Sequence, residues 1–209
     1  MRASHDRNRH CSRCYLRKDI CICSILPTVQ TRTEFVILRH IREENRPSNT
    51  GRLVALAMPS SRIVPCGGGD RIVVPSIDVE LQSGSGTWLL WPDGPGTQPG
   101  ISEIPSRVVV LDATWQQARR FFTSNPALWT MPRLVLPAPN RNRNRLREQH
   151  RPDGMSTIEA VAAAVKKLEG AEVAEPLERL YDEVVRRTMV LRWGVSCCPE
   201  PVRTGQQNL

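Results

Sequence analysis

Residues 108–120 read VVVLDATWQQARR, and this stretch indicates the fold of the chain. Its apolar start, Val108–Leu111, is typical of a buried β-strand, and Asp112 comes directly after that strand. The residues that follow predict a helix. Other apolar runs that read as strands lie at 35–38, 72–74, 88–91 and 134–136. Because these runs are continuously apolar and alternate with helices, we expect an α/β fold with a parallel sheet covered on both faces.

Two helices can be located from capping and stop residues. A helix over about 50–58 is predicted by the polar residues before it and by Pro59 after it. Ser156 and Glu159 form a capping box before an alanine-rich run, and Gly170 ends the helix that this run predicts. The C-terminal third of the chain is therefore expected to be helical.

The chain is long enough for one main domain. Its 209 residues can form a domain with its own core together with a small appendage. Pro27 and the polar residues up to Thr33 predict a linker between the two. We therefore expect a zinc-binding segment over residues 1–30 and a larger domain over 31–209, whose last helix opens at Pro176.

Four cysteines near the N-terminus have the spacing of a metal site. Cys11, Cys14, Cys21 and Cys23 follow the pattern CxxC-x6-CxC, and four thiolates so spaced can close on one tetrahedral zinc ion. The alternative is disulfides or free thiols, but the chain has seven cysteines, an odd number, and no secretory signal is recognised. Since four cysteines leave no open position on the ion, we expect the zinc to be structural.

The chain is strongly basic. Its formal net charge is +8 and its pI is about 9.6, almost wholly because of arginine. Guanidinium groups bind phosphate in a bidentate way, so we expect an anionic polymer as partner. The alternative is that the charge only keeps the protein in solution. No run of about 18 apolar residues occurs, so no membrane span is predicted and we expect a cytoplasmic protein.

Asp112 is the main candidate for chemistry. It lies at the end of a predicted strand and at the start of the helix that follows, where open parallel sheets hold their ligands. The alternative is a helix cap, in which its carboxylate accepts the backbone N–H of Thr114 or Trp115. Trp115 could likewise be a core residue or a surface on which a base stacks.

Four strings of residues together resemble the DTW-domain family. They are Asp112 to Trp115, the cysteine cluster, residues 46–52 (RPSNTGR) and residues 151–160 (RPDGMSTIEA). The resemblance spans about residues 11–190 and implies a domain similar to the SPOUT superclass of RNA-modifying enzymes, with a C-terminal trefoil knot. It also implies tRNA-uridine aminocarboxypropyltransferase activity. In that reaction the 3-amino-3-carboxypropyl group of S-adenosylmethionine passes to N3 of a uridine in tRNA, and methylthioadenosine is released.

This resemblance, together with the positions of the residues, suggests site roles. N3 of uridine must lose a proton, and Asp112 is the candidate base, with Thr114 and Trp115 expected beside it. The residues expected to bind the donor are His40, Ser48, Asn49, Thr50, Arg52, Leu111, Ser156, Thr157 and Glu159. Ordinary helix capping explains several of them without any function, and a lone histidine is more often structural.

The region after the last predicted strand is the most basic part of the chain. Alternating arginine and asparagine over 141–147 form helices and strands poorly, so we expect an exposed loop beside the site. The arginines expected to contact RNA phosphates are Arg119, Arg141, Arg143, Arg145, Arg147 and Arg151. The alternative is a solvated charged loop.

Two other interpretations of the function stay open. The chain could be an RNA methyltransferase of the same fold, or a zinc-dependent RNA-binding module without catalytic activity. Asp112 and Trp115, combined with a capped helix suited to the donor, favour an enzyme. No obligate protein partner is evident, and residues 78–101 receive no role.

Overall fold

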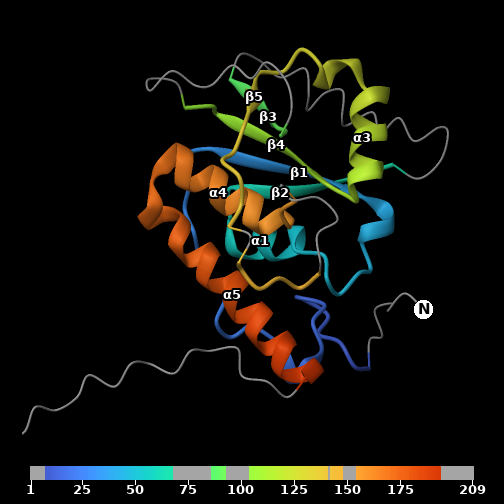
Figure 1. Cartoon of the computed structure of the whole chain (residues 1–209), viewed down its shortest axis with the longest axis vertical. Coiled ribbons are helices and arrows are strands. Elements are labelled where there is room, and N and C mark those ends of the chain that lie inside the picture. The colour runs from blue at the N-terminus through green and yellow to red at the C-terminus, as the bar shows by residue number, and fades with distance from the viewer. Residues whose placement is uncertain (1–7, 68–85, 93–103, 141, 148–153, 194–209) are drawn as a thin grey trace, which may run out of the picture.

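The computed structural model describes residues 8–67, 86–92, 104–140, 142–147 and 154–193, which form a sheet with helices on both faces (Figure 1). Its strands are β1 (Glu34–His40), β2 (Ser61–Cys66), β3 (Thr87–Leu90), β4 (Arg107–Asp112) and β5 (Arg133–Leu134). The helices within these ranges are α1 (Gly51–Ala57), α3 (Trp115–Ser124), α4 (Thr157–Glu169) and α5 (Ala171–Trp193). Short 3-10 helices are η1 (Lys18–Ile20), η2 (Ile41–Glu43) and η3 (Pro126–Leu128).

The five strands form a parallel sheet in the order β2-β1-β4-β3-β5, which confirms the predicted α/β fold. β1, β4 and β3 are the inner strands, because each of them pairs with a strand on either side. Central parallel strands are buried on both faces, and this burial explains why their sequences are continuously apolar.

Alternate residues of β1 face two different parts of the core. Phe35 and Ile37 belong to the buried cluster formed with α1, α4 and α5, whereas Val36 and Leu38 belong to the cluster under α3. Figure 1 shows the same division, with α1, α4 and α5 on one side of the sheet and α3 on the other. The helices that follow β1 and β4 therefore cover opposite faces.

The predicted helices are found with small changes at their ends. α1 and α4 lie where they are expected, and Gly170, with a φ of 105°, ends α4. The prediction that the last helix opens at Pro176 is wrong, since α5 begins at Ala171 and contains Pro176. Tertiary packing stabilises this extra turn, because Ala174 is fully buried in the core. No helix in the described ranges is both long and apolar enough to cross a membrane.

β2 is a strand that sequence analysis misses. Its residues read SRIVPC, and a proline inside a run argues against a strand. β2 is the outermost strand at its side of the described sheet and Pro65 is exposed, so the missing backbone N–H is tolerated there. The strand predicted at 72–74 lies outside the described residues.

The cysteine segment, residues 8–30, packs on the side of the sheet that carries α4 and α5. Leu16, Ile22 and Val29 belong to the same buried cluster as residues of α4 and α5. Arg187 of α5 also donates a hydrogen bond from Nη1 to the carbonyl oxygen of Cys21. Residues 8–30 therefore share a core with α4 and α5, and the domain boundary near residue 30 stays a prediction.

Candidate functional site

The carboxyl ends of β1 and β4 are where the topology predicts a ligand site. β1 leads into α1 on one face of the sheet, and β4 leads into α3 on the other (Figure 1). In α/β proteins, ligands bind beyond the carboxyl ends of two such neighbouring strands. Arg39 of β1 pairs in register with Asp112 of β4 at this position.

Asp112 is buried, and both of its carboxylate oxygens accept hydrogen bonds from distant side chains. Nδ2 of Asn49 donates to Oδ2, and Oγ1 of Thr157 donates to Oδ1, each at 2.6 Å. The alternative that Asp112 caps the following helix is wrong, because the N-cap of α3 is Thr114, which forms a capping box with Gln117. The Asp112 carboxylate faces the starts of α1 and α4 instead.

Gly51 allows α1 to approach Asp112 closely. A Cβ atom on Gly51 would lie 2.4 Å from Oδ2 of Asp112 and 3.3 Å from Cγ2 of Ile37. Any larger residue would therefore push the first turn of α1 away from the carboxylate. Gly51 belongs to one of the family strings but has no predicted role, since the close approach is visible only in three dimensions.

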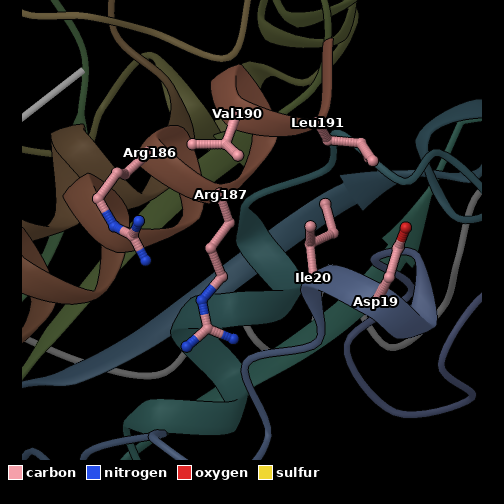
Figure 2. A pocket seen from close by; sticks show the side chains of 6 residues that line it. All are labelled: Asp19, Ile20, Arg186, Arg187, Val190 and Leu191. Carbon is pink, nitrogen blue, oxygen red and sulfur yellow. The ribbon is translucent and has the colours of Figure 1, made fainter. Parts of the chain in front are cut away.

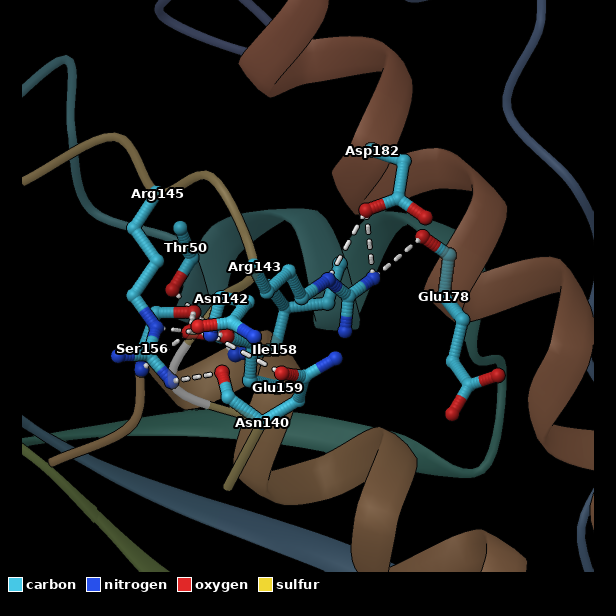
Figure 3. Close-up of polar contacts among 10 residues, drawn as sticks. All are labelled: Thr50, Asn140, Asn142, Arg143, Arg145, Ser156, Ile158, Glu159, Glu178 and Asp182. Atoms are coloured by element: carbon cyan, nitrogen blue, oxygen red, sulfur yellow. Dashed lines mark hydrogen bonds and ion pairs between the residues drawn. The ribbon is translucent and has the colours of Figure 1, made fainter. Parts of the chain in front are cut away.

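The starts of α1 and α4 contact each other (Figure 3), and both also approach Asp112. The backbone N–H of Ile158 donates to Oγ1 of Thr50 at 3.3 Å. In the predicted capping box, which is confirmed, the N–H of Ser156 donates to Oε2 of Glu159 at 2.9 Å. Nε of Arg145 donates to Oε1 of the same carboxylate at 3.1 Å. The structure thus brings together the residues of both helices that are predicted to bind S-adenosylmethionine.

Arg52 lies in the same region and is only 7% exposed. Its backbone N–H donates to Oδ1 of Asn49 at 3.2 Å, and its guanidinium carbon lies 3.5 Å from the centre of the Tyr15 ring. Burial, and then the charge of Arg39, lowers the pKa of Arg52 to about 10. Tyr15 and Arg39 are not among the predicted site residues, because no local pattern links either of them to Arg52.

His40 and Leu111 lie at the same edge of the sheet. Burial and the charges of nearby arginines lower the pKa of His40, which favours a neutral ring near pH 7. Its Nδ1 accepts the backbone N–H of Arg42 at 3.1 Å, so the proton of the neutral ring is on Nε2. Leu111 packs against the cluster under α3. Burial, and then the Asp112 charge, raises the pKa of the nearby Cys66 thiol to about 12.

Trp115 belongs to an aromatic stack on the α3 face. Its ring centre is 5.1 Å from that of Trp91, which is in turn 4.7 Å from that of Phe122. The exposed Arg119 has its guanidinium carbon 5.8 Å from the centre of the Trp115 ring. Asp112 contacts the starts of α1 and α4, whereas Trp115 packs in the cluster under α3. Asp112 and Trp115, although neighbours in one family string, therefore lie on opposite faces of the sheet.

The described arginines of the basic run contact the protein itself. Nη2 of Arg143 donates to Oδ1 of Asp182 at 2.7 Å (Figure 3). Nη2 of Arg147 donates to the carbonyl oxygen of Ser48 at 3.1 Å. The Arg147 side chain remains 43% exposed, whereas that of Arg145 is only 12% exposed. The other two arginines predicted in this run, Arg141 and Arg151, lie outside the described residues.

The N-terminal cysteines are arranged to hold a metal ion such as zinc. The four Sγ atoms lie within 4.8 Å of one another, and the pairs Cys11–Cys23 and Cys14–Cys21 are 3.7 Å apart. Zinc bonded to four sulfurs at about 2.3 Å would place the sulfurs about 3.8 Å from one another. The five described cysteines are all free thiols, so the disulfide alternative does not apply to them.

A pocket of about 400 Å³ lies between the cysteine segment and the end of α5 (Figure 2). Its lining residues are Asp19, Ile20, Arg186, Arg187, Val190 and Leu191. Both arginines are ion-paired with Glu183, whose pKa falls to about 2, mainly through its hydrogen bond with Arg186. No lining residue belongs to the group around Asp112, so the pocket is separate from that site.

Comparisons with known proteins agree on one family. The DTW domain matches residues 8–189. The mouse protein named tRNA-uridine aminocarboxypropyltransferase 2 is 31% identical over 177 residues, which cover 78% of this chain and 58% of the mouse protein. The Drosophila melanogaster protein of the same name is 28% identical over 172 residues, covering 78% of this chain and 68% of its own length. The chain thus spans less than two thirds of the mouse relative. No solved structure shows a significant match.

Proposed function

Because this chain belongs to the DTW-domain family, we propose that it is a tRNA-uridine aminocarboxypropyltransferase. It transfers the 3-amino-3-carboxypropyl group of S-adenosylmethionine to N3 of a uridine in tRNA and releases methylthioadenosine. The names of the mouse and Drosophila relatives support this activity. The observation that carries the proposal is the position of Asp112, which is buried between Asn49 and Thr157 at the carboxyl end of β4.

Asp112 is the proposed base. Its carboxylate takes the proton from N3 of the uridine, and N3 attacks Cγ of the aminocarboxypropyl group. The Cγ–S bond breaks and its electron pair stays on sulfur, so the sulfonium becomes the neutral thioether of methylthioadenosine. The hydrogen bonds from Asn49 and Thr157 hold the carboxylate in one direction, which reduces the reorganisation needed to reach the transition state.

The donor binds, in this proposal, at the adjoining starts of α1 and α4. The start of α1, over residues 48–52, is proposed to offer backbone N–H groups and Arg52 to the carboxylate of the donor. The proposed donor residues are His40, Ser48, Asn49, Thr50, Arg52, Leu111, Ser156, Thr157 and Glu159. In SPOUT-like enzymes the C-terminal loops and helix fold over the donor. The C-terminal trefoil knot stays a prediction based on that resemblance.

tRNA is bound, in this proposal, by the arginines near the site. Arg119 and Arg147 are the most available of those described, because Arg119 is exposed and the Arg147 side chain is 43% exposed. Arg143 and Arg145 must exchange their partners, Asp182 and Glu159, before they can contact phosphate, and Arg147 must likewise release Ser48 and Glu43. Arg141 and Arg151 are proposed contacts outside the described residues.

The ion at the cysteines is proposed to be zinc with a structural role. Four thiolate ligands would leave no position for water or substrate, so the ion would stabilise the segment and take no part in group transfer. The donor needs no further activation, because its sulfonium is already a good leaving group.

The test of this function is transfer from labelled S-adenosylmethionine to bulk tRNA, followed by mass spectrometry of the nucleosides. The expected product is a uridine that carries an aminocarboxypropyl group, together with an equal amount of methylthioadenosine. A methyl adduct would instead identify an RNA methyltransferase. RNA binding without any adduct would favour the non-catalytic module.

A further inference from the structure

Two buried arginines lie near Asp112, and each has a nitrogen without a hydrogen-bond partner in the described part of the chain. Arg39, near the end of β1, is 8% exposed, and Arg52, in the first turn of α1, is 7% exposed. Nε of Arg39 and Nη1 of Arg52 are both buried, and neither has a hydrogen-bond partner among the residues that the structure describes. Buried donors are almost always hydrogen-bonded, so two such atoms in one place indicate that a ligand supplies the missing acceptors.

The remaining contacts of the two guanidinium groups hold them in place. Nη2 of Arg39 donates to Oε1 of Glu44 at 3.0 Å. Nη2 of Arg52 donates to the backbone carbonyl oxygen of Glu44. The ring of Tyr15 stacks on Arg52. Both arginines are thus anchored to the segment between β1 and α1, and the unpartnered nitrogens belong to fixed groups.

Two positive charges held close together without solvent favour an anion. Arg39 and Arg52 are near enough for the charge of Arg39 to help lower the pKa of Arg52, after the larger effect of burial. The carboxylates of this region have other partners: Asp112 is bonded to Asn49 and Thr157, Glu44 accepts from Nη2 of Arg39, and Glu43 is ion-paired with Arg46. A planar carboxylate has two oxygens and can accept one N–H from each arginine.

We propose that Arg39 and Arg52 together bind the carboxylate of the methionine part of S-adenosylmethionine. This inference rests on the proposed function, and it adds Arg39, a residue that neither the sequence pattern nor the comparisons assign. Arg39 pairs in register with Asp112, and neighbouring strands are about 4.8 Å apart. A carboxylate bound between Arg39 and Arg52 would orient the methionine part of the donor, which contains Cγ, toward Asp112. Anchoring at this end would therefore select Cγ rather than the methyl carbon for transfer.

The experiment compares two ligands that differ in one group. S-adenosylmethionine and decarboxylated S-adenosylmethionine are titrated by calorimetry into the wild-type protein and into Arg39→Met. We expect the wild-type protein to bind S-adenosylmethionine more tightly. We expect Arg39→Met to weaken that binding by about 10- to 100-fold, as the loss of a charge-assisted hydrogen bond predicts, and to change binding of the decarboxylated ligand by less than about 3-fold.

Matched variants keep the test decisive. Arg107→Met removes an arginine from the opposite end of β4, where it pairs with Glu34, and should leave both affinities unchanged. Arg39→Lys keeps a charge without the planar fork and should also reduce the preference for the carboxylated ligand, so a poorly folded methionine variant does not end the test.

Equal weakening of both ligands by the Arg39 variants, or no weakening of either, would overturn the proposal. Loss of tRNA affinity in place of donor affinity would also overturn it, because the two nitrogens would then serve a phosphate. A wild-type protein that binds neither ligand would count against the proposed function itself, so the two failures can be told apart.

Discussion

The ring of Tyr15 stacks on the guanidinium group of Arg52, with 3.5 Å between the ring centre and the guanidinium carbon. Tyr15 directly follows Cys14 and has a φ of 62°, a left-handed conformation that is uncommon outside glycine. The cysteine segment therefore places an aromatic side chain against a buried residue of the proposed donor site. Metal binding at the cysteines and donor binding at Arg52 are expected to be linked through this contact.

Substitution of Tyr15 tests that link. We expect Tyr15→Ala to weaken S-adenosylmethionine binding by about 2- to 30-fold, because a cation–π contact is worth about 0.5–2 kcal/mol and its loss lets Arg52 move. Tyr15→Phe keeps the ring and should bind nearly as well as the wild-type protein. Calorimetric titration of the donor measures both. Similar affinities for the two variants would mean that the ring does not position Arg52.

Asp112→Asn separates catalysis from structure. Asparagine can still accept from Asn49 and can donate to the hydroxyl of Thr157, so we expect a folded protein that is less stable by about 1–3 kcal/mol. The chemical step should fall by roughly 10²–10⁴-fold, the usual contribution of a positioned base. Single-turnover transfer to tRNA and thermal unfolding measure the two effects. Near-normal transfer by the folded variant would remove Asp112 from the mechanism.

Gly51→Ala should disturb the site through contact alone. The added Cβ would lie 2.4 Å from Oδ2 of Asp112, so α1 or the carboxylate must shift, at a cost of about 1–3 kcal/mol. We expect both stability and transfer rate to fall. Ala55→Gly, in the same helix, is the control: it should cost about 0.5–1 kcal/mol and leave the rate unchanged. A normal rate for Gly51→Ala would show that the site tolerates the shift.

Metal content tests the cysteine cluster. Elemental analysis of gently purified protein should find about one zinc per chain, and Cys11→Ser should lower that value. Apparent zinc binding free energies of about 10–16 kcal/mol are typical of such sites, so the segment should lose its order without the ion. Because Leu16 and Ile22 lie in the shared core, we also expect a lower melting temperature for the whole protein. Protein that contains no metal would contradict the proposal.

Two arginines of the basic run should behave differently. Arg147→Ala is expected to weaken tRNA binding and to lower the slope of log affinity against log salt by about 0.7–0.9, the effect of one lost phosphate contact. Arg145→Ala should mainly destabilise the fold, because the Glu159 side chain is 5% exposed and would lose its cation. Filter binding over a range of salt, together with thermal unfolding, distinguishes them. An unchanged slope for Arg147→Ala would indicate a solvated loop.

Local patterns in the chain were sufficient for the central features of this protein. The apolar run that ends at Asp112 and the capping box of Ser156 with Glu159 depend on residues that are neighbours in sequence. The same holds for the spacing of the four cysteines. Such features follow from hydrophobic periodicity, helix-end hydrogen bonding and ligand spacing, which act over one or two turns of chain. β2 is the exception, because Pro65 hides a strand that the edge of the sheet accommodates.

Tertiary structure decided how these parts meet. Asp112 is bonded to Asn49 and Thr157, which lie 63 and 45 residues away in sequence. The pairing of Arg39 with Asp112 depends on the register of two parallel strands, and the contact between Tyr15 and Arg52 depends on how the cysteine segment packs. No local pattern encodes these contacts, because each is selected by burial and packing of the whole core. Within the described ranges, that packing leaves two arginine nitrogens near the proposed base without a hydrogen-bond partner.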